Sequence, residues 1–234
     1  MTASRGIRQD YFFDSERKSR VRSRLAFASV LLLGLVLTHI LDNQLFKATY
    51  VGADQVAFTE SRAWYQILRQ VGDARSWLIV AAAGVAHAFW RAAQGQGTRA
   101  RLGAMLAIFV GPVLGGLCAE LLRAVLSRER PLSLDGTFQG HVWDVPFSGV
   151  YSAGRWFDVS NLGLPSSHAA VAMAGAIAAA RAFPGSGWIL VPVAVGCGWT
   201  RMLSGRHFSS DVFLGLMVGW VAGNLAAALL RRIR

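Results

Sequence analysis

Apolar residues in this chain gather in six long stretches, separated by polar segments that are rich in arginine. A helix needs about 20 mostly apolar residues to cross a bilayer, and the second and fourth stretches reach that length only with their flanking residues. The pattern therefore predicts an all-α fold, an integral membrane bundle of six transmembrane helices. The predicted spans are residues 25–41, 77–90, 102–122, 169–180, 188–203 and 212–230.

The placement of arginine predicts how the bundle is oriented. Residues 1–24 are polar and basic, and no small-x-small cleavage site follows the first apolar stretch. We therefore expect a cytoplasmic basic tail ahead of a retained first span, with residues 25–234 as a single six-helix domain. Six spans put both ends of the chain on one side, which the positive-inside rule makes cytoplasmic. The basic residues that fall on this side with the tail are Arg91, Arg99, Arg101, Arg181 and those of 231–234.

Two further patterns predict how segments lie. Residues 58–71 mix apolar and charged positions at helical spacing, and we expect one amphipathic helix along the outer membrane interface. Gly215, Gly219 and Gly223 recur every four residues. They therefore share one helix face, which we expect to press against the bundle.

Composition supports a membrane protein and argues against other classes. Charged residues make up 16% of the chain and the mean hydropathy is +0.39, whereas soluble domains carry about 25% charged residues. The formal net charge is +11, but the basic residues follow the membrane topology, so we expect no nucleic-acid partner. Cys118 and Cys197 have no partner at metal-ligand spacing, and we expect no metal site and no cofactor.

Three clusters of polar residues lie at the ends of apolar stretches, in the connections expected on the extracytoplasmic side. Arg123, Arg130 and Arg201 offer planar guanidinium groups, which bind phosphate through paired hydrogen bonds. Arg123 and Arg130 are seven residues apart and share a face if their helix continues through both. We expect the three arginines to converge on one dianionic group. The alternative is that each of them snorkels to lipid headgroups.

The second cluster is typical of a helix start. Pro165 suits the first helical turn, and Ser166 and Ser167 suit the cap. Free backbone N–H groups at such an end bind anions. His168 at that position can protonate a leaving oxygen.

His207 and Asp211 form the third cluster together with Arg201. They are four residues apart, which places one above the other on a helix. The carboxylate would then fix the imidazole tautomer and present the other ring nitrogen as a nucleophile. The alternative is a local contact within the helix.

Together these clusters resemble the signature of the phosphatidic acid phosphatase type 2 family, whose site is similar to that of vanadium-dependent haloperoxidases. The family pattern is Lys-x6-Arg-Pro, then Pro-Ser-Gly-His, then Ser-Arg-x5-His-x3-Asp, and the match runs from position 123 to position 211. Arg123 stands where the family has lysine, Ser167 where it has glycine and Thr200 where it has serine.

The resemblance implies a role for each matching position. His207 would attack phosphorus and form a phosphohistidine, Asp211 would orient it, and His168 would protonate the departing group and then activate water. No metal would be needed, because arginines would stabilise the charge. The phosphate oxygens would be held by Arg123, Arg130, Arg201, Ser166 and Ser167.

We therefore expect a metal-independent lipid phosphatase in a bacterial inner membrane, which hydrolyses a lipid phosphate or diphosphate monoester on the extracytoplasmic face. Its partners would be membrane lipids and a lipid phosphate substrate. Polyprenyl diphosphate, a phosphatidate-like lipid and a lipid A phosphate all remain open, as does the oligomeric state. One alternative is a phosphotransferase that passes the phosphoryl group to an acceptor alcohol. Another is a non-catalytic transporter or scaffold with a residual motif.

Overall fold

The computed structural model describes residues 3–95, 99–133, 135–147 and 161–230. The helices in these residues are α1 (Ala3–Ile40), α2 (Asp42–Thr49), α3 (Ala53–Ser61), α4 (Ala63–Gln70), α5 (Ala74–Ala93), α6 (Arg99–Leu126), α8 (Ser167–Ala182), α9 (Gly187–Leu203) and α10 (Ser209–Leu230). The described residues otherwise form loops with isolated bridges and no strand, which confirms the all-α prediction. Each predicted apolar stretch coincides with one helix, namely α1, α5, α6, α8, α9 or α10.

Three helical segments in the described residues are long and apolar enough to cross a membrane. They are Val21–Ile40 of α1, Arg101–Leu126 of α6 and Ser209–Leu230 of α10. Helix α9 is apolar but shorter, and α8 has 16 residues. The length and apolar composition of these helices are typical of a membrane protein. That six helices cross the membrane stays a prediction.

The chain divides into two units, Met1–Leu37 and Thr38–Arg234. The first unit contains most of α1, which is one helix from Ala3 to Ile40. The basic segment expected as a tail therefore continues into the helix of the first span, apart from its first two residues, which lie outside the described ones. The cytoplasmic side assigned to it stays a prediction, and residues 231–234, which supported that side, also lie outside the described residues.

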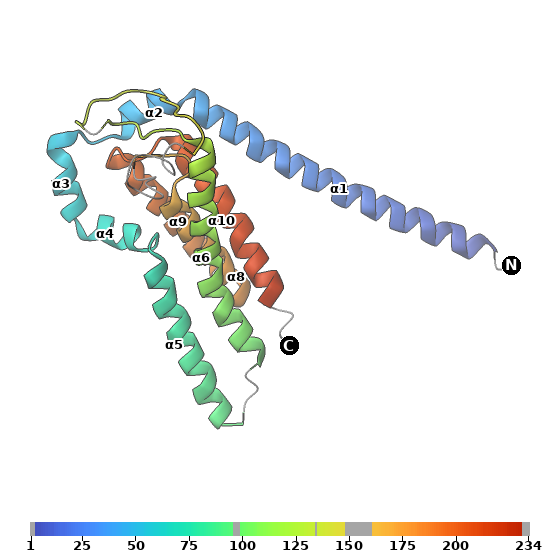
Figure 1. Ribbon diagram of the computed structural model, residues 1–234. Helices are drawn as coiled ribbons and strands as arrows, with labels where there is room; N and C mark the ends of the chain where they lie inside the picture. Colours follow the sequence, from blue (N-terminus) through green and yellow to red (C-terminus); the bar gives the residue numbers. More distant parts are fainter. Residues whose placement is uncertain (1–2, 96–98, 134, 148–160, 231–234) are drawn as a thin grey trace. The chain divides into compact units, whose positions relative to one another are not determined.

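Helix α8 is the central element of the second unit and packs against α6, α9 and α10 (Figure 1). Most of its buried residues are alanine, and such small side chains allow neighbouring helix backbones to approach closely. Gly215, Gly219 and Gly223 of α10 face α8, as predicted. A Cβ added at Gly219 would collide with the carbonyl oxygen of Ala170.

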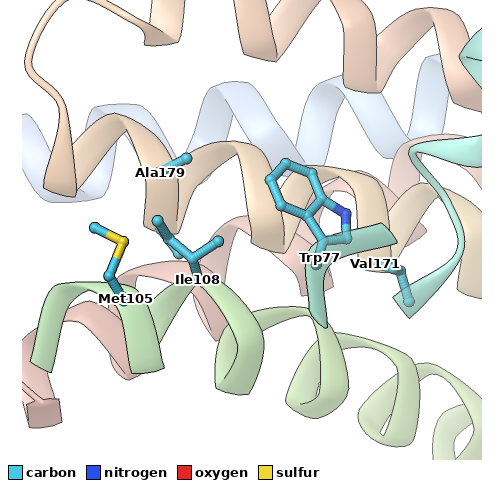
Figure 2. Close-up of a cluster of buried hydrophobic side chains, with 6 residues drawn as sticks. Trp77, Met105, Ile108, Val171 and Ala179 are labelled. Carbon is cyan, nitrogen blue, oxygen red and sulfur yellow. The ribbon is translucent and has the colours of Figure 1, made fainter. Parts of the chain in front are cut away.

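Trp77 attaches the start of α5 to this bundle (Figure 2). Its ring is buried between α6 and α8, and its indole N–H donates to the carbonyl oxygen of Val71 at 2.8 Å. Gly175 leaves room for the ring, because a Cβ there would overlap it. These contacts fix the turn between α4 and α5 beside α8. The buried cluster comprises Trp77, Met105, Ile108, Val171, Ala178 and Ala179.

The segment 58–71 differs from the prediction of a single amphipathic helix. It is divided between α3 and α4 because Arg62 is extended, with φ −70° and ψ 135°. Tyr65 in α4 is wholly buried, and its hydroxyl donates to the Glu60 carboxylate at 3.1 Å. The break allows α4 to pack against α9.

The close contact of α8 with α10 predicts a strong effect of side-chain size at Gly219. Gly219→Leu forces a side chain into the α8 backbone, and we expect a lower thermal unfolding midpoint in detergent, in line with about 1–3 kcal/mol for overpacking. Val221→Leu is the matched control, because Val221 is exposed on the same helix. Equal unfolding midpoints for the two variants would contradict this packing.

Candidate active site

Helix α6 ends at Leu126, soon after Arg123. Ser127 has φ 46°, the left-handed conformation that commonly ends helices, and its hydroxyl donates to the carbonyl oxygen of Ala124 at 2.8 Å. The helix therefore does not continue to Arg130. The condition under which Arg123 and Arg130 would share a helix face is not met.

Arg130 belongs instead to an extended segment held between two other stretches of chain. On one side, the backbone N–H of Glu129 donates to the carbonyl oxygen of Val142 at 2.9 Å. On the other side, the N–H of Arg130 donates to the carbonyl oxygen of Asn161 at 3.0 Å. Arg130 thus enters the site from a loop that is fixed by backbone hydrogen bonds.

The second cluster lies at the start of α8, as predicted, but Pro165 precedes the Ser166 cap and does not lie in the first helical turn. Ser166 precedes the helix, and its backbone N–H donates to the carbonyl oxygen of Asp211 at 2.9 Å. This bond joins the start of α8 to the start of α10. The Ser166 hydroxyl is buried and makes no capping hydrogen bond.

Two of the residues that depart from the family pattern contact each other. Arg123 Nη2 donates to Ser167 Oγ at 3.0 Å and to the carbonyl oxygen of Pro165 at 3.1 Å. Its Nη1 pairs with the Glu120 carboxylate at 3.0 Å. The third departure, Thr200, directs its hydroxyl to the carbonyl oxygen of Cys197 at 2.7 Å. Arg123 therefore fixes the start of α8 through two donor contacts while its other nitrogen stays paired with Glu120 on α6, a geometry that a lysine ammonium could not match.

His207 lies outside the helix that carries Asp211. Helix α9 ends at Leu203 and α10 begins at Ser209, so the predicted stacking of His207 and Asp211 on one helix is wrong. Asp211 lies in the first turn of α10, where its Oδ2 accepts a hydrogen bond from the N–H of Phe208 at 2.8 Å. The same oxygen is 3.5 Å from His207 Nδ1. The His207 imidazole, which precedes α10, is thus paired with the Asp211 carboxylate in the first turn of that helix.

His168 is held by the turn between α4 and α5. A Cβ at Gly72 would lie 2.8 Å from Cys197 Sγ and 2.9 Å from His168 Cβ, so glycine allows this close approach. The ring of His168 is close enough to Arg201 and His207 to interact with both electrostatically. The structure therefore brings both predicted histidines into one site.

Positive charge accumulates around the two histidines. Burial, together with the charges of Arg123, Arg206 and Arg201, lowers the pKa of Arg130 from 12.5 to about 10. We call these four residues the arginine cluster. Arg206 was not singled out in the sequence, although its place next to His207 is a signal that could have identified it.

Several buried polar atoms in the site have no hydrogen-bond partner among the described residues. A buried donor without a partner costs about 1–3 kcal/mol, and such groups are rare. Guanidinium and hydroxyl groups of this kind can all donate to the oxygens of one bound anion. These donors are Arg123 Nε, Arg201 Nε and Ser166 Oγ. His207 Nδ1 also lacks a partner within hydrogen-bond geometry, but it faces Asp211 Oδ2 at 3.5 Å and not the anion.

Burial also sets the charge of His207. It lowers the pKa of the imidazole from 6.5 to about 4, against the opposing effect of Asp211. The ring is therefore neutral at pH 7, the form that acts as a nucleophile. Because Nδ1 faces Asp211, we assign the proton to Nδ1 and the free lone pair to Nε2.

A second buried network lies on the other side of Asp211. The wholly buried Arg128 donates through Nη2 to Asp211 Oδ1 and to Ser210 Oγ, the latter at 2.7 Å. Its Nη1 donates to Asp42 Oδ2 at 3.3 Å. Asp42 and Arg128 belong to none of the three sequence clusters and were not predicted as site residues. A carboxylate directly after an apolar stretch was a signal for Asp42, because charges near a membrane usually have partners.

Asp42 also belongs to a group of potential metal ligands. His39, Asp42 and His141 place ligand-type atoms within 4.8 Å of one another. However, Arg128 Nη1 lies 3.2 Å from His39 Nδ1 and 3.3 Å from Asp42 Oδ2. A divalent cation here would face the guanidinium charge at contact distance, which makes this group a poor metal site.

A cavity of about 460 Å³ lies beside the arginine cluster. Arg130 and Arg206 line part of it, and Tyr50, Ala53 and Val56 line another part. Small-molecule sites have volumes of about 300–1,000 Å³. A cationic wall combined with an apolar one suits a ligand that carries both a phosphate and an uncharged body.

Comparison with known proteins identifies the family. The sequence profile of the PAP2 superfamily matches residues 101–234, which include all three clusters and more than half of the chain. This chain belongs to the PAP2 superfamily. The family predicted from the three motifs is thereby confirmed.

Two curated relatives of this PAP2 chain are named lipid A 1-phosphatase. The protein of Rhizobium johnstonii is 34% identical over 112 residues, which cover 48% of this chain and 42% of that protein. The protein of Rhizobium etli is 33% identical over 112 residues, covering 48% and 44%. The match thus spans less than half the length of either relative. Among solved structures, the crystal structure of Aquifex aeolicus LpxE is similar, with a TM-score of 0.47, 18% identity and coverage of 80% of this chain and 95% of that one.

The buried imidazole of this PAP2 site predicts a pH-dependent stability. The folded His207 titrates near 4 and the unfolded residue near 6.5, so between these values the unfolded state binds the extra proton. The free energy of unfolding should therefore fall as the pH drops through this window, by up to about 3 kcal/mol. We would compare thermal unfolding midpoints of the wild type and His207→Gln from neutral pH to about pH 4. His207→Gln should lack this pH-dependent loss of stability. Parallel curves of unfolding midpoint against pH for the two proteins would contradict a buried neutral imidazole.

Proposed function

We propose that this chain is a metal-independent lipid phosphatase that acts through a phosphohistidine on His207. The observation that carries the proposal is the arginine cluster around two histidines, with buried donors on Arg123, Arg201 and Ser166 that lack partners. A phosphate group supplies both the negative charge and the acceptor oxygens that these donors require. Membership of the PAP2 superfamily and the names of the curated relatives also support a phosphatase.

In the first step, His207 Nε2 forms a bond to phosphorus while the bond between phosphorus and the lipid oxygen breaks. Asp211 lies 3.5 Å from Nδ1, where it stabilises the positive charge that develops on the ring. The negative charge of the bound phosphate favours the protonated form of His168, which donates its proton to the departing oxygen, and that oxygen leaves as an alcohol. The arginine cluster stabilises the charge on the remaining phosphoryl oxygens.

In the second step, His168 takes a proton from water, whose oxygen attacks phosphorus. The bond between phosphorus and His207 Nε2 breaks, and inorganic phosphate leaves. The guanidinium groups provide the charge stabilisation that a metal ion gives in other phosphatases. We therefore expect catalysis without a divalent cation.

The start of α8 contributes to phosphate binding in two ways. The backbone N–H of Ser166 is already bonded to Asp211, so Ser166 would bind through its buried hydroxyl. The first N–H groups of a helix, here from Ser167 onward, have no partner within the helix. They would bind a phosphoryl oxygen while Arg123 holds the Ser167 hydroxyl.

As substrate we propose a phosphorylated glycolipid of the lipid A type. The curated relatives are named for lipid A, and the cavity of about 460 Å³ provides space for a bulky polar head beside Arg130. Polyprenyl diphosphates and phosphatidate-like lipids carry a different head at that position. The relative rates of phosphate release from the three lipid classes would therefore identify the substrate.

We further propose a six-span protein of a bacterial inner membrane with the site on the extracytoplasmic face. The residues of the site lie at alternating helix ends, with Arg123 and Arg201 near the ends of α6 and α9, and His168 and Asp211 near the starts of α8 and α10. Alternating ends of successive spans face the same side of a membrane. This arrangement supports one polar surface for the whole site.

The proposal predicts that phosphate release requires His207 and no divalent metal. In purified protein, His207→Asn should lower release from lipid A by at least about 1,000-fold, as for other covalent nucleophiles, and EDTA should leave the wild-type rate unchanged. His87→Asn, which removes an exposed histidine on α5, is the matched control. Polyprenyl diphosphate and phosphatidate are assayed in parallel. A wild-type rate for His207→Asn would remove this residue from the mechanism, and loss of activity in EDTA would contradict metal independence.

The orientation predicts which positions an impermeant reagent labels. Thr137 is exposed in the loop after α6, and Gln94 is exposed at the end of α5. With Cys118 and Cys197 replaced by alanine, a membrane-impermeant maleimide added to spheroplasts should label Thr137→Cys. It should label Gln94→Cys only after permeabilisation, and the reverse pattern would place the site on the cytoplasmic side.

A further inference from the structure

Arg128 has no role in the proposed mechanism, although it is one of the largest wholly buried side chains. A buried guanidinium is costly unless it is paired and hydrogen-bonded. Arg128 is paired on two sides, with Asp211 through Nη2 and with Asp42 through Nη1. It therefore joins the carboxylate beside His207 to a second carboxylate at the start of α2.

The two oxygens of Asp211 have different partners. Oδ2 accepts from the N–H of Phe208 at 2.8 Å and lies 3.5 Å from His207 Nδ1. Oδ1 accepts from Arg128 Nη2. The terminal torsion of a carboxylate is soft, so bonds to both oxygens are needed to fix its rotation. The Arg128 contact thus keeps Oδ2 directed at the imidazole.

Arg128 is itself fixed from several sides. Its guanidinium lies 5.2 Å from the ring centre of Phe208 and 5.6 Å from that of Trp143, within the range of cation–π attraction. Asp42 holds Nη1 at 3.3 Å and also accepts from the N–H of Ser210 at 2.8 Å. This carboxylate is therefore anchored to α10 and cannot move away from the arginine without losing that bond.

We propose that Arg128 is a positioning residue for the phosphatase reaction, which holds the Asp211 carboxylate at the angle that orients His207, and that Asp42 in turn holds Arg128. The inference rests on the proposed role of His207. It makes the start of α2, which lies outside all three sequence clusters, part of the machinery that supports catalysis.

Removal of the Arg128 charge has a consequence that loss of packing would not have. The charged groups that act on His207 are Asp211, Arg123 and Arg201, and His168 also interacts with it. Arg128 offsets the charge of Asp211 from the far side. Without it, Asp211 attracts the imidazole proton more strongly, and the pKa of His207 rises. The acid limb of the pH–rate profile should then move to higher pH.

The test is a double-mutant cycle on the detergent-solubilised full-length chain, with phosphate release from lipid A as the readout. Arg128→Gln should lower kcat by about 10- to 100-fold, the usual cost of losing a residue that orients a catalytic group, with a smaller change in KM. In an Asp211→Asn background the same substitution should have little further effect, because it acts through Asp211. The acid limb of kcat/KM should move upward by about one pH unit in the single variant.

Two variants keep the test decisive. Arg181→Gln is the matched control, because Arg181 bonds to Asn224 at the far end of α8, at 2.7 and 3.1 Å. Asp42→Asn preserves shape, removes the charge that holds Arg128, and should lower kcat by about 3- to 10-fold, with the effect again absent in the Asp211→Asn background. Folding of each variant is judged by size exclusion and thermal unfolding. If Arg128→Gln does not fold, the Asp42→Asn result decides whether Arg128 acts through Asp211.

A folded Arg128→Gln variant with a wild-type kcat and an unmoved acid limb would overturn the inference. The inference would also be overturned if Arg128→Gln lowered kcat by the same factor in the wild-type and Asp211→Asn backgrounds. His207→Asn separates this result from failure of the proposed function. If His207→Asn still releases phosphate, the proposed function is wrong. If His207→Asn is inactive while Arg128→Gln keeps full activity, the inference alone is wrong.

Discussion

An excess of buried positive charge over negative charge is the constraint on which this site depends. Arg123 and Arg201 are 5% and 7% exposed, and burial together with their charges lowers the pKa of Arg130. The buried carboxylate of the site, Asp211, already pairs with Arg128. Buried guanidinium groups this close together repel one another, so the rest of the fold must hold them in place. An anion bound among them would relieve the repulsion and would supply the missing hydrogen-bond acceptors.

The fold meets this demand through close backbone contacts at helix ends. Gly219 allows α10 to lie against the backbone of α8, and the bond from Ser166 to the carbonyl oxygen of Asp211 joins the first turns of these helices. Gly163 serves the same purpose in the loop, because a Cβ there would lie 3.0 Å from Asp211 Oδ2. The Asp211 carboxylate and the start of α8 with His168, to which we assign catalysis and phosphate binding, are thus fixed to one another by backbone atoms, which move less than side chains.

Much of this arrangement could be predicted from local pattern. Hydropathy located all six apolar helices, and motif spacing identified the family and brought Arg123, His168 and His207 into one candidate site. The errors occurred where a single backbone conformation decides the outcome. Ser127 adopts a left-handed conformation and ends α6 before Arg130, and Arg62 is extended and divides the predicted amphipathic helix. Neither residue has a type that requires such a conformation.

The pairing of Asp42 with Arg128 could not be predicted for a different reason. The two residues are far apart in the sequence, and the contact exists only because α2 packs against the start of α10. No periodicity or spacing encodes such a contact. Tertiary packing therefore places Asp42 and Arg128 behind the motif residues, whereas the motif itself can be recognised in the sequence.

In the proposed mechanism, the arginine cluster binds the transferred phosphoryl group while His207 attacks it. Vanadate adopts the five-coordinate geometry of phosphorus under attack, so a structure of the protein with orthovanadate would show which residues surround that group. We expect vanadium bonded to His207 Nε2, with its oxygens on Arg123, Arg130 and Arg201. Vanadate bound to His168 instead, or bound away from these arginines, would contradict this mechanism.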